Sequence, residues 1–300
     1  MNIEKIDFKA TDGVQLVGLL HKPENKTDKV LIAVHGMTSN CFKYREDVIA
    51  QKMVENNIAF FGFNNRGSEL MKYIKREKEN GEIEGDLGGT SFEDVLDGYY
   101  DIKGAILKML ELGYKEIYLQ GHSLGSTKVV YTYTMLNKNK EKEILDKIKG
   151  IILLSLVDIS NMLELGLGKD KFIKMNKHAE ELVQKEKQNE LMPKDSFMHP
   201  ISAKTFLRYS KYNKDIDFAR YMDNDYSFSE LNNIKCPLFM RWGDTNELIQ
   251  IPAEELVCKM QNKITKEDKD ISYIKGADHG YSEKEEELAS EILKFLIKIN

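Results

Sequence analysis

The chain has 300 residues and a formal net charge of −5, with 31% charged and 41% hydrophobic residues. This composition is typical of a soluble globular protein and excludes a disordered or fibrous chain. The mild acidic excess argues against nucleic acid or an anionic membrane as the main partner, because both are bound by basic surfaces. The three cysteines, Cys41, Cys236 and Cys258, are too few for a disulfide framework and indicate a reducing compartment.

The first residues, MNIEKIDFKATDG, contain no apolar run of signal-peptide length. No other stretch approaches the roughly 20 apolar residues that a membrane-spanning helix needs. We therefore expect a cytoplasmic protein without a membrane span, present as a monomer or a homodimer.

Strand-like apolar runs alternate with helix-like segments along most of the chain. Strands are predicted at 3–9, 15–21, 29–34, 59–63, 116–120, 150–156, 237–242 and 270–275. Helices are predicted at about 41–56, 93–112, 125–138, 252–262 and 283–298, the second of them capped by Thr90 and Ser91. The first two strands read as a hairpin. The rest of the alternation predicts an α/β protein with an eight-stranded, mostly parallel sheet and one antiparallel edge.

Two segments interrupt this alternation. Residues 68–90 are charged and glycine-rich, and we expect an exposed excursion there. Residues 159–230, which follow the sixth strand, begin with many Lys and Glu residues and end with many aromatic residues. We predict that residues 159–230 form a helical cap inserted into one core domain made of residues 1–158 and 231–300.

The strongest chemical signal is the sequence GHSLG at 121–125, a G-x-S-x-G pattern between a predicted strand and a predicted helix. A sharp turn in this context, a nucleophile elbow, exposes the serine hydroxyl above the carboxyl edge of the sheet. The helix that starts behind it favours developing negative charge. We therefore predict that Ser123 is a nucleophile.

A serine nucleophile needs a base and an oxyanion hole. His279 follows the last predicted strand, so a loop at the same sheet edge can bring it to Ser123. The HGMTS turn after the third strand stands where this architecture supplies an oxyanion donor. We predict that the backbone amides of Met37 and Leu124 form the oxyanion hole.

Together, GHSLG, HGMTS, NNRG, WGDTNE and GADHGY resemble the α/β-hydrolase superfamily over nearly the whole chain. The resemblance is to bacterial serine carboxylesterases, in particular to a group similar to cinnamoyl (feruloyl) esterases and siderophore-ester hydrolases. It implies an α/β-hydrolase fold, with helices on both faces of the sheet and a cap after the sixth strand. It also implies a catalytic triad, whose acid in this family usually stands three residues after the glycine that ends the seventh strand.

That position holds Asn246 in this sequence. An amide can orient a histidine but cannot offset its positive charge, and the Asp-to-Asn change in a serine protease costs about 10⁴ in rate. Glu247 is our preferred acid, ahead of Asp244 and Asp158, and Asn246 remains an alternative as a neutral orienting group.

The expected function is hydrolysis of a small or medium acyl or aryl carboxylic ester through an acyl-enzyme intermediate. The expected partner is a small-molecule ester, and neither a metal nor an organic cofactor is needed. Two alternatives remain open: an amide or thioester hydrolase that uses the same residues, and a hydrolase-fold protein that binds ligands with little turnover. The sequence does not identify the natural substrate.

Overall fold

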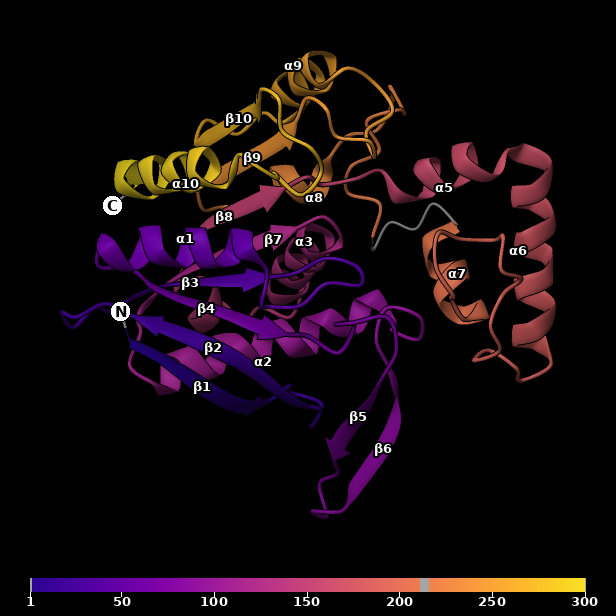
Figure 1. The fold of residues 1–300 in the computed structure, drawn as a ribbon, viewed down its shortest axis with the longest axis horizontal. Helices are drawn as coiled ribbons and strands as arrows, with labels where there is room; N and C mark the ends of the chain where they lie inside the picture. Colours follow the sequence, from indigo (N-terminus) through magenta and orange to yellow (C-terminus); the bar gives the residue numbers. More distant parts are fainter. Residues whose placement is uncertain (1, 211–215, 300) are drawn as a thin grey trace.

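The computed structural model describes residues 2–210 and 216–299. Residues 1, 211–215 and 300, which fall at the ends of the expected core and inside the expected cap, lie outside the described residues. The described chain contains a sheet of eight strands in the order β1-β2-β4-β3-β7-β8-β9-β10 (Figure 1). Their bounds are β1 Asn2–Lys9, β2 Gln15–Lys22, β3 Lys29–Val34, β4 Ala59–Asn64, β7 Glu116–His122, β8 Ile148–Leu154, β9 Leu238–Gly243 and β10 Lys269–Ile274.

Strand β2 pairs antiparallel with both β1 and β4, and the other neighbouring strands of this sheet pair in parallel. The predicted mostly parallel sheet with an antiparallel edge is therefore confirmed. The central strands are continuous apolar runs because helices cover both of their faces. In β3, for example, every residue after Lys29 is buried. The edge strand β1 instead buries only Ile6 and Phe8.

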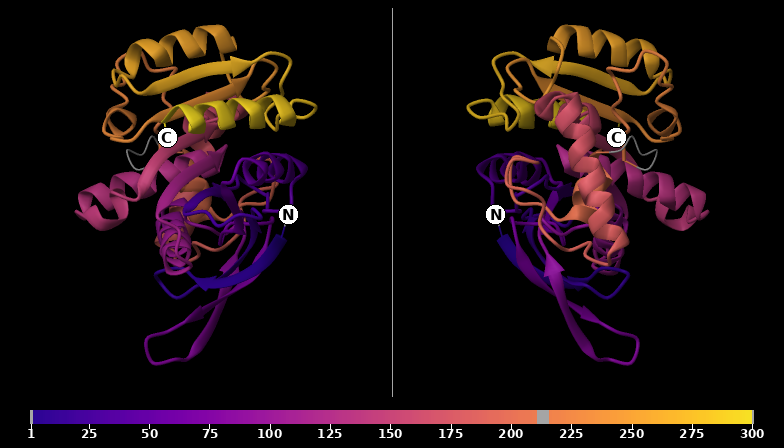
Figure 2. Two further views of the ribbon diagram at one scale, coloured as in Figure 1. Left: turned by 90° about the vertical axis from the view of Figure 1, so that its left-hand side faces the viewer. Right: turned by 90° about the vertical axis from the view of Figure 1, so that its right-hand side faces the viewer.

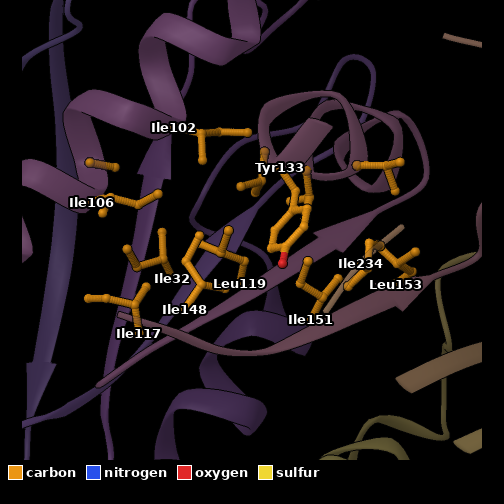
Figure 3. Close-up of a cluster of buried hydrophobic side chains, with 14 of the residues drawn as sticks. Ile32, Ile102, Ile106, Ile117, Leu119, Tyr133, Ile148, Ile151, Leu153 and Ile234 are labelled. Atoms are coloured by element: carbon orange, nitrogen blue, oxygen red, sulfur yellow. The ribbon is translucent and has the colours of Figure 1, made fainter. Parts of the chain in front are cut away.

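Helices pack against both faces of the sheet. On one face lie α1 (Tyr44–Glu55) and α10 (Glu285–Ile299), and on the other lie α2 (Gly98–Glu111), α3 (Leu124–Lys138) and α9 (Ala253–Lys263). Successive residues of one strand enter the two cores, as Leu31 and Ile32 do. Figure 3 shows the core between the sheet and helices α2 and α3, where Ile102 and Ile106 of α2 face Ile32 and Leu119 of the sheet. The short elements are η1 (Val95–Asp97), α4 (Lys142–Leu145) and α8 (Ser229–Asn232).

The excursion at residues 68–90 contains two strands that the sequence did not reveal. Strands β5 (Lys72–Glu77) and β6 (Ile83–Gly88) form a separate antiparallel sheet that projects from the molecule (Figures 1 and 2). Charged residues occupy most positions of β5, and β6 contains two glycines and two acidic residues, so the segment lacks the apolar alternation that predicts a strand. The reversal between the strands includes Gly81, whose φ of +84° suits glycine.

The predicted caps of the helix after this hairpin are wrong. The first helical turn starts at Val95, and the side chain that caps it is Asp94, whose carboxylate accepts the Leu96 N–H. The Thr90 hydroxyl donates to the carbonyl of Gly67, and the Ser91 hydroxyl donates to the carbonyl of Pro200. Both side chains therefore tie distant loops together.

A group of three helices follows β8, the sixth strand of the large sheet. We call α5 (Ile159–Leu167), α6 (Lys169–Gln184) and α7 (Ala203–Ser210) the helical insertion. It lies beyond the carboxyl ends of β3 and β8 in Figure 1, and α6 faces the viewer in the right-hand view of Figure 2. Its core is a separate apolar cluster that also includes Leu124 of α3.

The aromatic residues at 197–228 divide between two cores. Phe197, Phe206 and Tyr209 are buried in the core of the helical insertion, whereas Phe218 and Phe228 are buried in a main core beside the sheet. The chain has therefore rejoined the main body by residue 218. In the described ranges, no helix is both long and apolar enough to cross a lipid bilayer.

Candidate active site

Ser123 occupies a sharp turn between β7 and α3. Its backbone has φ 55° and ψ −124°, a conformation that non-glycine residues rarely adopt. A Cβ atom at Gly121 would lie 2.5 Å from the backbone of Gly125, and one at Gly125 would lie 2.1 Å from the carbonyl oxygen of Val34. Both glycines are therefore required by close backbone approach. The turn places Ser123 in the wall of a pocket of about 460 Å³.

The turn after β3 lies directly against the serine. A Cβ atom at Gly36 would stand 2.9 Å from the Ser123 Cβ and 3.4 Å from its hydroxyl oxygen. Met37 and Leu124, whose amides we predicted as oxyanion donors, line the same pocket. Across the two described ranges, neither amide donates a hydrogen bond. Both N–H groups are thus available to a substrate oxygen.

A buried neutral histidine fixes the turn after β3, residues 35–39, which we call the oxyanion turn because we expect it to supply an oxyanion donor. The Nε2 atom of His35 accepts the Asn65 N–H at 3.2 Å, so its Nδ1 carries the proton and donates to the Gly36 carbonyl at 2.9 Å. Burial lowers the pKa of His35 to about 3, which keeps this pattern intact at neutral pH. The Thr38 N–H donates to the Thr90 hydroxyl at 2.7 Å and holds the other side of the turn.

The NNRG segment, residues 64–67, lies against this turn. Arg66 is buried and forms ion pairs with Asp101 and Asp12 at 2.7 and 2.8 Å. Its neighbour Asn65 provides the N–H that His35 accepts. The segment therefore acts as scaffold for the oxyanion turn.

His279 follows β10 and lines the same pocket as Ser123. The pKa of its imidazole is lowered to about 4, chiefly by burial and in part by the charge of Arg45, while Glu247 and Asp278 oppose the shift. The ring is therefore neutral at pH 7 and able to accept a proton. Within residues 2–210 and 216–299, no hydrogen bond joins the Ser123 and His279 side chains. Catalytic hydrogen bonds often tighten only when substrate is bound.

Asn246 contacts a nitrogen of the His279 ring. Its Oδ1 lies 3.1 Å from the ring Nδ1 and also accepts the Leu248 N–H at 2.9 Å. A backbone N–H can only donate, so the amide atom between Leu248 and His279 is the oxygen. It follows that His279 carries its proton on Nδ1 and leaves the lone pair on Nε2.

The three carboxylates that we considered for the triad occupy other positions. Glu247 is exposed, and its Oε2 lies 3.4 Å from the backbone nitrogen of His279 instead of the ring. Asp244 accepts the Gly276 N–H at 2.6 Å. Asp158 is buried at the N-terminus of α5, where burial raises its pKa to about 7. The structure thus brings Asn246 to the ring, with Glu247 next to it.

Two further residues near His279 were missed by the sequence reasoning. The His122 ring and the Ser155 hydroxyl both donate hydrogen bonds to the backbone carbonyl of His279. His122 directly precedes Ser123 within GHSLG, and this position was the available signal. Ser155 carried none, because a serine just after a buried strand is common in loops.

The pocket is lined by both apolar and charged side chains. The apolar ones include Val157, Ile159, Met162 and Leu248, and the charged ones, at the starts of α1 and α10, are Lys43, Arg45 and Glu285. Among the residues that the structure describes, no three His, Cys, Asp or Glu side chains are grouped in a way that would hold a metal ion.

Comparison with known proteins gives a family and a fold. Residues 102–298 match the family described as "Protein of unknown function (DUF1749)". A search of curated protein sequences found no match.

Several solved structures are similar over almost their full length. Est1E from Butyrivibrio proteoclasticus, with ferulic acid bound, is 18% identical, with a TM-score of 0.66 and coverage of 97% of this chain and 98% of that chain. The Pyrococcus furiosus esterase Pf2001 is 17% identical, with a TM-score of 0.60 and coverage of 99% and 91%. The α/β hydrolase GrgF from Penicillium sp. sh18 is 15% identical, with a TM-score of 0.62 and coverage of 99% of both chains. The chain therefore belongs to the DUF1749 family and has the α/β-hydrolase fold.

Proposed function

We propose that this protein is a serine hydrolase that cleaves carboxylic esters. The observation that carries the proposal is the shared pocket of Ser123 and His279, in which Asn246 fixes the proton of His279 on Nδ1. The unprotonated Nε2 is then the atom that accepts the serine proton. Similarity to the esterase Pf2001 and to the α/β hydrolase GrgF supports the choice of hydrolysis.

The reaction proceeds in two halves. Ser123 Oγ attacks the ester carbonyl while His279 Nε2 takes its proton, and the amides of Met37 and Leu124 bind the developing oxyanion. His279 then protonates the departing alcohol, which leaves an acyl-enzyme. Water, deprotonated by His279, attacks the acyl carbon, and the carboxylic acid product is released with Ser123 regenerated.

Orientation and charge compensation are divided between two residues. Asn246 holds the ring through its Oδ1 and carries no charge. Glu247, which contacts the backbone nitrogen of His279, supplies negative charge close to the imidazolium and raises the pKa of His279. An exposed carboxylate is screened by water, so this compensation is weaker than that of a carboxylate on the ring.

The pocket suits a small or medium acyl or aryl group. Its volume of about 460 Å³ is at the lower end for small-molecule sites. Apolar side chains of the helical insertion, including Ile159 and Met162, form part of its wall. We propose that the helical insertion acts as a cap over the pocket and selects the acyl group.

Turnover of p-nitrophenyl acetate and butyrate tests the proposed activity. We expect hydrolysis that Ser123→Ala abolishes and that Ser282→Ala, a change at another pocket-lining serine, leaves within a fewfold of the parent. Amide and thioester substrates with the same acyl group would be compared in parallel. Hydrolysis that persists in Ser123→Ala would contradict the proposed role of Ser123.

One observation favours a second candidate, a ligand-binding protein with little turnover. The neutral Asn246 offsets no charge when His279 becomes protonated, so the chemical step is slowed. Binding of an ester substrate or its acid product without measurable turnover in the same assay would favour this candidate.

A further inference from the structure

The backbone carbonyl of His279 is held by two side chains at neighbouring strand ends. His122 Nε2 lies 2.8 Å from this oxygen, and Ser155 Oγ lies 3.1 Å from it. His122 is the last residue of β7 and directly precedes Ser123, and Ser155 follows β8. The histidine loop is thus tied to the two strands that also fix the nucleophile.

The acceptor at this contact determines which nitrogen of His122 carries a proton. A carbonyl oxygen only accepts, so His122 Nε2 carries a proton and donates it. Burial lowers the pKa of His122 well below its ordinary value, and the ring stays neutral. Its centroid lies 5.0 Å from that of the His279 ring, where a second positive charge would oppose formation of the imidazolium.

The contact is supported by a strained residue and a buried tyrosine. Ser155 is fully buried and has a φ of 49°, a strained value for a non-glycine residue. Its hydroxyl also lies 3.1 Å from the hydroxyl of Tyr281, which donates its own proton to the Arg241 carbonyl at 2.7 Å. The single proton of Ser155 is therefore shared between the His279 carbonyl and the Tyr281 oxygen. The loop is therefore held at His279 through its backbone carbonyl and at Tyr281 through its side chain.

We propose that His122 and Ser155 are positioning residues that hold the His279 backbone so that its ring stays between Asn246 and Ser123. Asn246 alone fixes one ring atom, which leaves the ring free to move with its loop. The carbonyl contact removes that freedom. This role rests on the proposed function for its catalytic consequence, whereas the positioning itself is measurable without turnover.

The test compares His122→Leu with His122→Gln, because a glutamine amide can donate to the carbonyl and a leucine cannot. In His122→Leu we expect kcat to fall about 10- to 100-fold with KM nearly unchanged, the size of loss that a misplaced catalytic group produces. We also expect the pKa of His279, measured by NMR titration, to rise from about 4 toward 6.5, because a displaced ring gains solvent. His122→Gln should recover most of both effects.

Ser155→Ala provides a second variant that removes half of the contact. It should show smaller changes of the same sign, and thermal unfolding would verify that each variant is folded. An unchanged His279 pKa and unchanged kcat in both His122→Leu and Ser155→Ala would overturn the positioning role. A shifted His279 pKa in a protein that shows no turnover in any form would instead contradict the proposed function and leave the positioning role in place.

Discussion

At the scale of single residues, the proposed mechanism depends on the contact between Asn246 and the His279 ring. The Leu248 N–H fixes the amide oxygen toward the ring, and this selects the tautomer that a base needs. The Nδ2 atom of Asn246 is buried without a hydrogen-bond partner in the described part of the chain. A carboxylate in the same place would keep both contacts and add negative charge.

The Asn246→Asp change is therefore expected to raise activity. A negative charge on Nδ1 stabilises the imidazolium, so kcat/KM should rise at least about tenfold, within the limit of about 10⁴ set by the reverse change in a serine protease. The pKa of His279 should also rise from about 4, so the acid limb of kcat/KM moves to higher pH. The pH–rate profiles of both proteins provide the measurement.

Asn246→Leu is the matched control, since it removes the polar contact and keeps a similar volume. It should lower kcat/KM without moving the acid limb upward. Equal or lower activity of Asn246→Asp, with an unshifted acid limb, would refute the assignment of Asn246 as the orienting residue.

The sequence predicted that Ser123 and His279 lie at one site, and both line one pocket, but it did not predict which residue contacts the His279 ring. Ser123 and His279 stand at turns where glycine spacing and strand ends fix the backbone, so pattern alone places them at the sheet edge. Asn246 and Glu247 are adjacent in a loop, and spacing cannot say which of two neighbours turns toward a ring. That choice depends on the hydrogen bond of Leu248, which only the folded loop provides.

At the scale of elements, the strands were easier to predict than the loops between them. A central parallel strand such as β3 is buried on both faces and reads as an unbroken apolar run. The hairpin of β5 and β6 is largely exposed and charged, so hydrophobic periodicity does not mark it. Thr90 resembles a helix cap in sequence, but tertiary contacts place it against the oxyanion turn.

That position of Thr90 gives a prediction about the turn. Thr90→Val removes the acceptor of the Thr38 N–H and the donor to the Gly67 carbonyl, with little change in shape. We expect a loss of about 1–3 kcal/mol of stability for the unpaired groups. Loosening of the oxyanion turn should also lower kcat about 10- to 100-fold, up to the loss seen when an oxyanion donor is removed.

Thr90→Ser keeps the hydroxyl and serves as the control for this substitution. Urea unfolding and ester turnover of the two variants provide the measurements. Similar kcat values in Thr90→Val and Thr90→Ser would show that the Met37 amide does not depend on this contact.

At the scale of the whole molecule, a buried ion pair beside the sheet contacts the helical insertion. Lys128 of α3 and Glu93 lie 2.6 Å apart, and each side chain is 1% exposed. Glu93 also accepts from the Tyr209 hydroxyl of α7 at 3.4 Å, and its carbonyl accepts from the Thr205 hydroxyl at 2.9 Å. Helix α3, which follows Ser123, and the helical insertion are thus linked through Glu93.

Removing one partner of this pair should destabilise the protein strongly. Lys128→Met leaves the Glu93 carboxylate buried without its cation, so we expect a loss of about 3–5 kcal/mol in the free energy of unfolding. The double change of Lys128→Met with Glu93→Met leaves no buried charge and should recover much of this loss. Urea denaturation of the three proteins measures both effects, and equal stability of the parent and Lys128→Met would contradict a structural role for the pair.

The central claim is that Ser123 is an activated nucleophile, and covalent labelling tests it most directly. The protein would be treated with a fluorophosphonate probe, digested, and mapped by mass spectrometry to find the modified residue. We predict a single adduct on Ser123 that is absent in Ser123→Ala and slower to form in Asn246→Leu. An adduct at another residue, or labelling that Ser123→Ala leaves unchanged, would contradict the account.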